Sequence, residues 1–147
     1  EDQADQAMLA NAQFGFNSLR GRVKTLVMAR LVHMQPYREA LRRAGPHAAL
    51  SAPGWMWRTA DRIWKALGDP STDYNFYSKR TILTGVLAAT MLVFLADETE
   101  ELVETEAFLT RRLDGVMAFE KAKAAAAKFV PDSGPVLDAL ARMRFGR

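Results

Sequence analysis

The side chains that could take part in metal binding are few in this chain and far apart in sequence. His33 and His47 are the only histidines, and neither follows a glutamate by three residues, as a histidine ligand of a di-iron helical bundle would. The chain has no cysteine, so thiolate nucleophiles and zinc–thiolate sites are excluded. We therefore expect no metal site.

Hydroxyl groups give no better support for catalysis. An activated serine or threonine needs a base beside it, and Ser71, Thr72 and Ser78 have no histidine near them in sequence. Residues 97–106 hold six acids and no base, which is typical of an exposed helix start rather than of paired catalytic carboxylates. We expect neither a catalytic residue nor a cofactor. An enzyme acting on a hydrophobic substrate remains an alternative that no group of residues supports.

The charge of the chain argues against nucleic-acid binding. The net charge of the 147 residues is +3, too small to indicate such a protein. Lysine and arginine are concentrated in residues 20–43, where seven of them accompany one glutamate. This segment shows no helix-turn-helix pattern, so we interpret it as a solvated helix face and expect no nucleic-acid partner.

The elements that must position these residues are all helices. Apolar residues recur at helical spacing and no segment alternates with a period of two, so we predict an all-α fold. Gly45 and Pro46 predict a helix stop, Ser51 to Pro53 a new start, and Gly68 a left-handed end. Helices are expected over residues 12–34, 36–44, 53–67, 73–96 and 99–127.

The sequence divides into a helical domain, residues 1–130, and a linker with a C-terminal amphipathic helix, residues 131–147. The uncharged run at residues 81–96 is shorter than the roughly 20 residues that a membrane span needs, so we expect a buried core helix. The C-terminal helix is too short to be stable alone. A bilayer, the chain's own domain and a second protomer are open alternatives for its surface. The residues that would lie on a membrane are Val136, Leu137, Leu140, Met143 and Phe145, with Arg142 and Arg144.

Two long stretches, "WRTADRIWKALGDPSTDYNFYSKRTILTGVL" and "FLADETEELVETEAFLTRRLDGVMAFEKAKA", resemble the COQ9 family of ubiquinone-biosynthesis accessory proteins. The resemblance is strongest from Trp57 to Ala124 and extends back to about Phe16. Its most specific part is the pattern G-D-x-S-T-D-x-N-x-Y-x-K-R at residues 68–80. Lys79-Arg80 and the "VMAFEKAKA" ending look more like the bacterial branch of the family.

The resemblance implies a TetR-like ligand-binding helical bundle that is neither an enzyme nor a repressor. Members of the family bind isoprenoid lipid or a quinone precursor in an apolar pocket, form homodimers and use a final amphipathic helix at the membrane. They present the precursor to the demethoxyubiquinone hydroxylase. The implied location is peripheral, on the cytoplasmic face of the bacterial inner membrane or the matrix side of the mitochondrial one.

The resemblance also assigns site residues. The hydroxylase-binding patch maps to Asp73, Phe76, Tyr77 and Arg80, and their spacings of three and four place them on one helix face, which we expect to be exposed. Phe76 stands where many members carry tryptophan, so the ring is kept but its N–H donor is lost. Lipid contacts are expected from Trp57, Trp64, Leu83, Val86, Leu87, Met91 and Val116.

One function of a different class stays open, the ligand-sensing domain of a TetR-type transcriptional regulator. The helices that correspond to the TetR DNA-binding region are not in this chain, and we expect a lipid pocket that is more open than is usual in the family. A helix-turn-helix encoded upstream, with operator binding by the full-length protein, would favour the regulator.

Overall fold

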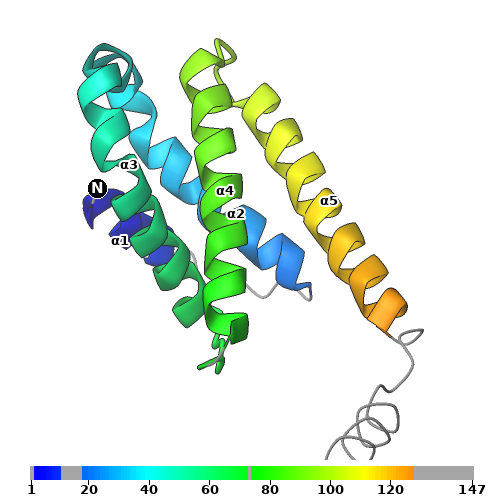
Figure 1. The fold of residues 1–147 in the computed structure, drawn as a ribbon. Coiled ribbons are helices and arrows are strands. Elements are labelled where there is room, and N and C mark those ends of the chain that lie inside the picture. Colours follow the sequence, from blue (N-terminus) through cyan, green and yellow to red (C-terminus); the bar gives the residue numbers. More distant parts are fainter. Residues whose placement is uncertain (1, 11–17, 73, 128–147) are drawn as a thin grey trace, which may run out of the picture. The chain divides into compact units, whose positions relative to one another are not determined.

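A computed structural model of the chain describes residues 2–10, 18–72 and 74–127 (Figure 1). Within these residues every regular element is helical, which confirms the all-α prediction. Residues 1–115 form one compact unit and residues 116–147 a second, and each is described by itself. The TetR-like topology and the boundary near residue 130 stay predictions. The elements are α1 (Asp2–Ala10), α2 (Leu19–Met34), the 3-10 helix η1 (Gln35–Tyr37), α3 (Arg38–Ala66), α4 (Tyr74–Ala96) and α5 (Val103–Ala127).

Helices α1 and α2 pack together, and each buries residues at helical spacing. The hydroxyl of Ser18 caps α2 by accepting the Gly21 N–H at 3.1 Å, so the helix predicted from residue 12 is seen from residue 19. Residues 11–17 lie outside the described part of the chain. The sequence did not predict α1, which buries Ala4 and Met8. Apolar spacing predicts a stripe of Phe16, Leu19, Val23, Leu26 and Arg30, joined by Val27, Leu31 and Met34. The stripe is buried from Val23 onward, but Leu19 is 43% exposed and Phe16 lies outside the described residues.

Helix α3 is continuous, so the predicted stop and new start at residues 45–53 are wrong. Each proline in this segment removes one helical N–H donor, which favours a break. However, distant segments hold both ends of α3. Arg38 and Arg42 donate to the carbonyls of Asp97 and Leu95 at the end of α4, and the second half of α3 packs in the core. Tertiary packing therefore outweighs the local preference.

The turn between α3 and α4 is a Schellman motif. Gly68 has a φ of 74°, the left-handed conformation that the sequence predicts. Its N–H donates to the Lys65 carbonyl, and the Asp69 N–H donates to the Trp64 carbonyl, both at 3.0 Å. These bonds satisfy carbonyls that the end of a helix leaves free. The chain then reverses, and α4 packs along α3 (Figure 1).

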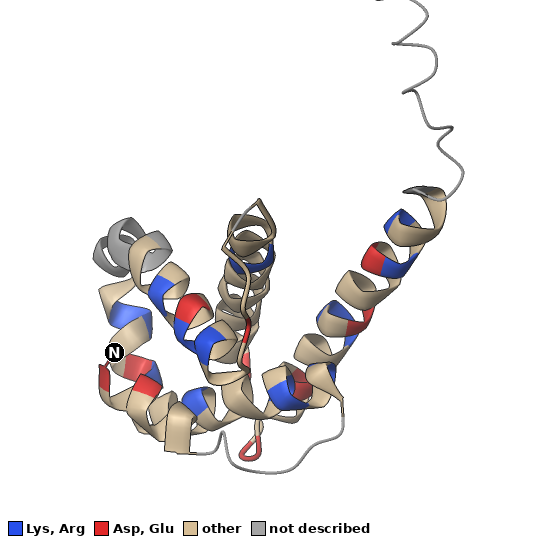
Figure 2. Ribbon diagram, turned by 90° about the horizontal axis from the view of Figure 1, so that it is seen from below, with Lys and Arg blue, Asp and Glu red and all other residues tan. Residues whose placement is uncertain are grey.

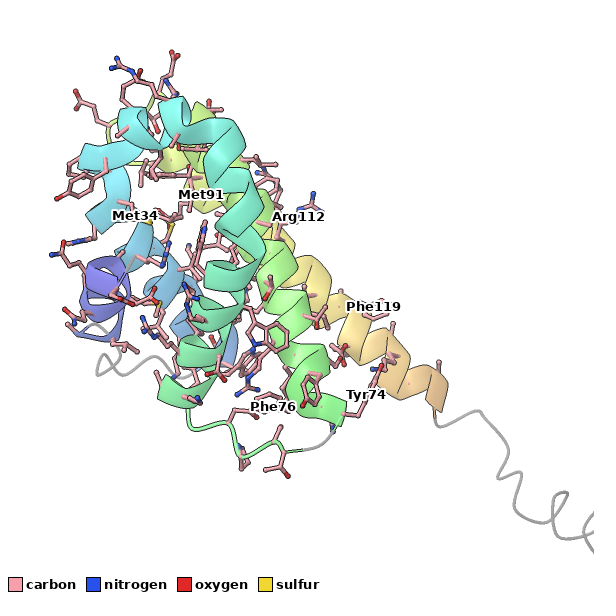
Figure 3. All side chains as sticks on the ribbon, turned by 60° about the vertical axis from the view of Figure 1, so that its left-hand side comes forward. Met34, Tyr74, Phe76, Met91, Arg112 and Phe119 are labelled. Carbon is pink, nitrogen blue, oxygen red and sulfur yellow. The ribbon has the colours of Figure 1, made fainter. Side chains whose placement is uncertain are left out.

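Helix α4 supplies the apolar centre of the first unit. Lys79 and Arg80 are its only charged residues, and the rest of α4 is tan in Figure 2. Figure 3 shows Met91 with Met34 among the helices, and both are buried. Among the described residues, α4 is long and apolar enough to cross a membrane, but the core helix of a folded domain passes the same test. Leu83, Val86, Leu87 and Met91, which are expected to line the core or a lipid pocket, are buried.

Helix α5 begins later than predicted, at Val103, because Asp97 turns inward instead of starting the helix. The Asp97 carboxylate is fully buried and accepts the N–H groups of Thr99 at 2.9 Å and Thr105 at 2.8 Å, together with both hydroxyls. The expectation of a wholly exposed acidic cluster is therefore wrong at this residue. The other acids of residues 97–106 are exposed. The core stripe predicted for this helix is Leu102, Leu109, Leu113 and Val116; the three leucines are buried, whereas Val116 is half-buried.

Candidate functional site at the α3–α4 turn

The turn that carries the pattern at residues 68–80 is closed by hydrogen bonds between its own polar residues. The side chain of Asp69 is 4% exposed and accepts from the Nζ of Lys79 at 2.7 Å and from the hydroxyl of Ser71 at 2.9 Å. The same Nζ donates to the Ser71 oxygen at 2.8 Å. The indole N–H of Trp64 donates to the Lys79 carbonyl at 3.2 Å, which ties the first turns of α4 to the end of α3.

Arg80 joins this turn to helix α3. Its side chain is 1% exposed, and its Nε donates to Oδ1 of Asp61 at 2.8 Å. Its Nη1 donates to Oδ2 of Asp69 at 3.3 Å and to the backbone carbonyl of Phe76 at 3.2 Å. The guanidinium also lies 3.5 Å from the centre of the Phe76 ring. Two carboxylates, a carbonyl and an aromatic face therefore surround one buried cation.

The carboxylates of this network stay ionised. Burial opposes the charge of Asp61, but hydrogen bonds from Lys65 and Arg80 outweigh it and lower the pKa of Asp61. Burial likewise opposes the charge of Asp69, and hydrogen bonds from Lys79, Ser71 and Arg80 lower the pKa of that carboxyl as well. The ion pairs are thus complete at neutral pH.

A group of aromatic rings lies at the same end of α4, and we call Trp57, Tyr74, Phe76 and Tyr77 the aromatic patch. Tyr74 and Tyr77 are 78% and 62% exposed. The Phe76 ring meets the Tyr77 ring edge-on at 5.1 Å between centroids, and Trp57 of α3 stacks on Tyr77 at 6.5 Å. Figure 3 shows Tyr74 and Phe76 at the start of α4. Exposed tyrosine rings supported by half-buried rings, with basic residues nearby, are typical of protein-binding surfaces.

The residues expected to bind the hydroxylase differ in their exposure to solvent. Tyr77 is exposed and Phe76 is half-buried, whereas Asp73 lies outside the described residues. The expectation that Arg80 lies on the exposed face is wrong, because Asp61 of α3 and Asp69 of the turn draw its guanidinium inward. Helical spacing places Arg80 beside Phe76, but it does not reveal those two partners.

The residues expected to contact lipid differ in burial. Trp57 and Trp64 are half-buried at the α3–α4 turn, and Trp57 belongs to the aromatic patch. The four expected residues of α4 are buried in the core of the first unit. Val116 is half-buried and begins the second unit. The residues expected at a membrane, 136–145, lie outside the described part of the chain. Lipid contact at all these residues stays a prediction.

A second buried polar cluster, which the sequence did not predict, joins α1, α2 and α3. The carboxylate of Asp5 accepts from Arg30 at 2.8 Å, from the Thr59 hydroxyl at 3.1 Å and from Arg62 at 2.5 Å. Arg30 also lies 5.0 Å from the Trp55 ring centre. The only sequence signal is the position of Arg30 within the apolar stripe of α2. In the described residues, no three His, Asp or Glu side chains are grouped as a metal site would require.

Comparison with known proteins adds to this geometry. The COQ9 family model matches residues 50–120, which include the α3–α4 turn, the aromatic patch and the first part of α5. The chain is 31% identical to the ubiquinone biosynthesis protein COQ9, mitochondrial, of Homo sapiens over 100 residues, 65% of this chain and 31% of that protein. It is 28% identical to the probable ubiquinone biosynthesis protein coq9, mitochondrial, of Dictyostelium discoideum over 111 residues, 72% of this chain and 36% of that one.

A shorter match reaches higher identity. The chain is 40% identical to the mitochondrial COQ9-A protein of Xenopus laevis over 57 residues, 39% of this chain and 18% of that protein. It thus spans about a third or less of the length of these curated relatives. The family match and the relatives agree with the pattern at residues 68–80. Through the region of residues 50–120, this chain is a member of the COQ9 family.

Proposed function

We propose that this protein is a non-catalytic accessory protein of ubiquinone biosynthesis that binds an isoprenoid quinone precursor and presents it at a membrane to the demethoxyubiquinone hydroxylase. The role in ubiquinone biosynthesis follows from family membership. One observation on α4 supports the proposed lipid binding and hydroxylase docking. The helix begins with exposed aromatic residues and continues as a long apolar segment.

The apolar length of α4 supports the lipid part of the proposal. After Arg80 no charged residue follows until Asp97, so more than four helical turns offer only apolar and small polar side chains. Part of this surface is exposed, since Leu92 is 71% exposed and Thr81 and Gly85 are exposed as well. A lipid chain covering such a surface would gain about 25 cal/mol for each Å² of apolar area removed from water. We therefore assign the isoprenoid ligand to α4 and its neighbours.

The aromatic patch supports the protein-binding part. Tyr77 presents a large ring whose position is set by Phe76 and Trp57, so little conformational entropy is lost when a partner covers it. Lys79 lies at the same turn with its side chain 38% exposed, and would favour an acidic partner surface. We assign this surface to the hydroxylase, with the chain acting as a peripheral membrane protein and a homodimer. In a mitochondrion the location would be the matrix side.

The direct test is the identity of the bound ligand. Protein purified without detergent is extracted with organic solvent, and the extract is analysed by mass spectrometry. The proposal predicts an isoprenoid or quinone species in roughly stoichiometric amount, absent from a helical protein of similar size purified in parallel. Repeated recovery of ligand-free protein from gentle preparations would contradict lipid binding. Specific binding of an operator DNA by the full-length protein would instead favour a TetR-type regulator.

A further inference from the structure

The side chain of Arg80 cannot meet a protein partner directly. It is 1% exposed, and its Nε and Nη1 already donate to Asp61, Asp69 and the Phe76 carbonyl. A charge this deeply buried is costly unless its partners are well placed, and the loss of one partner leaves an uncompensated charge. The Arg80 guanidinium is therefore fixed in position, and it restricts the side chains that it contacts.

Arg80 touches the base of the aromatic patch. Its guanidinium covers the Phe76 ring at 3.5 Å, and Phe76 meets Tyr77 edge-on at 5.1 Å. Tyr77 in turn stacks on Trp57, which comes from the other helix. A continuous row of contacts thus runs from the carboxylate of Asp61 to the exposed Tyr77 ring.

We propose that Arg80 is a positioning residue of the docking surface. Held by Asp61 and Asp69, it fixes the ring of Phe76 and through it the exposed ring of Tyr77, and it makes no contact with the partner. This inference rests on the docking function proposed above for the aromatic patch. Asp61, which lies outside the pattern at residues 68–80, thereby becomes part of the docking site although its side chain is only 20% exposed.

The first test needs no partner. The chain has three tyrosines, Tyr37, Tyr74 and Tyr77, so protein labelled with 3-fluorotyrosine gives three ¹⁹F NMR signals that Tyr→Phe variants assign. Asp61→Asn leaves Arg80 in place but removes one of its anionic partners. We expect the Tyr77 signal to shift or broaden in Asp61→Asn and in Arg80→Lys, with Tyr37 unchanged. Lys65 is the other partner of Asp61, and its side chain is 68% exposed. Lys65→Met should therefore leave all three signals unchanged.

The second test measures hydroxylase binding at two salt concentrations. Asp61→Asn and Arg80→Lys should each weaken binding about tenfold or more, the loss typical of a disturbed hot spot. The double variant should lose no more than the stronger single variant, since both changes break one row of contacts. Lys65→Met keeps wild-type affinity. Because Arg80 does not meet the partner, the salt dependence of binding by Arg80→Lys and Asp61→Asn should match that of the wild type.

The outcomes distinguish the positioning role of Arg80 from the docking function proposed for the aromatic patch. A Tyr77 signal that is unchanged in folded Asp61→Asn and Arg80→Lys proteins overturns the positioning role. Wild-type affinity in Asp61→Asn with a large loss in Arg80→Lys overturns it too, because that result marks Arg80 as a contact. Wild-type protein that does not bind the hydroxylase contradicts the proposed docking function, while a shifted Tyr77 signal still supports positioning of the patch.

Discussion

The Nε of Arg30 on α2 donates to the Oδ1 of Asp5 on α1 at 2.8 Å, and both side chains are almost completely buried, at 2% and 5% exposure. The Thr59 hydroxyl and the Nη1 of Arg62, both on α3, donate to the same carboxylate. One acid of the short helix α1 therefore links the three N-terminal helices. Its hydrogen bonds also raise the pKa of the Arg62 guanidinium.

This arrangement predicts a large difference between two acids of α1. Asp5→Ala leaves Arg30 buried without its carboxylate and should lower the free energy of unfolding by about 3–5 kcal/mol. Asp2 pairs with the same Arg62 but is 82% exposed, so Asp2→Ala should change the free energy of unfolding by less than about 1 kcal/mol. Urea denaturation followed by circular dichroism measures both. Equal effects in the two variants would show that burial of the Asp5 pair does not matter.

The Asp97 cap predicts a loss of stability in acid. Burial opposes the charge of Asp97, but hydrogen bonds from the side chains and N–H groups of Thr105 and Thr99 outweigh it and lower its pKa from 3.8 to about 2. Because the pKa of Asp97 is lower in the folded state than in the unfolded state, its ionisation stabilises the fold. This stabilisation is complete above about pH 4 and is lost as the pH falls toward 2. It amounts to about 2 kcal/mol.

Asp97→Asn should therefore be less stable than wild type at pH 7, and the gap should narrow between pH 4 and pH 2. Glu98→Gln, one residue along and exposed, is the matched control and should follow the wild-type curve. Thermal melts at a series of pH values test this. A gap of constant size across that range would mean that ionisation of Asp97 is not the stabilising factor.

Two glycines predict stability changes of opposite sign. A Cβ at Gly68 meets no atom within 4 Å, but its φ of 74° disfavours every other residue, so Gly68→Ala should destabilise by about 1 kcal/mol. Gly85 lies in the middle of α4 with equally open space, and Gly85→Ala should stabilise by about 0.5–1 kcal/mol. Chemical denaturation of the pair checks the sign. Destabilisation by Gly85→Ala would reveal that another surface covers this part of α4.

The aromatic patch predicts a binding defect without a folding defect. Tyr77→Ala removes a ring that is 62% exposed, so the melting temperature should change little, whereas hydroxylase affinity should fall by a factor of about 30 or more, as for a hot spot. Tyr37→Ala removes a tyrosine of similar exposure, 57%, from η1, and should bind normally. Isothermal titration with the purified hydroxylase measures both. Full affinity in Tyr77→Ala would remove the patch from the proposal.

The C-terminal residues predict membrane binding that depends on lipid charge. Deletion of residues 131–147 removes five large apolar side chains together with Arg142, Arg144 and Arg147, and each base is worth about 1 kcal/mol at an anionic surface. Flotation with vesicles that contain anionic lipid should fall sharply, and with neutral vesicles only slightly. Unchanged flotation would favour docking of this segment on protein instead.

The sequence predicted much of the helical architecture because apolar periodicity and glycine chemistry are local properties. The buried stripe of α2, the left-handed Gly68 and the apolar interior of α4 follow from residues within a few positions of one another. Local signals also misled at residues 45–53, where α3 continues because packing at both of its ends outweighs two prolines. The resemblance found in residues 68–80 identified the family, since that pattern is long and specific.

Only the tertiary structure decided which charges are buried. Arg80 meets Asp61, 19 residues away, and Arg30 meets Asp5, 25 residues away, and no periodicity within one helix reports such a partner. A lone charge belongs in water, whereas a charge met by a carboxylate from another helix can lie inside the protein. The sequence by itself therefore determined that the fold is all-α, where most of the helices lie and which family the chain resembles. The fold decided that Arg80 is buried against the ring of Phe76 instead of lying beside Tyr77 on the surface.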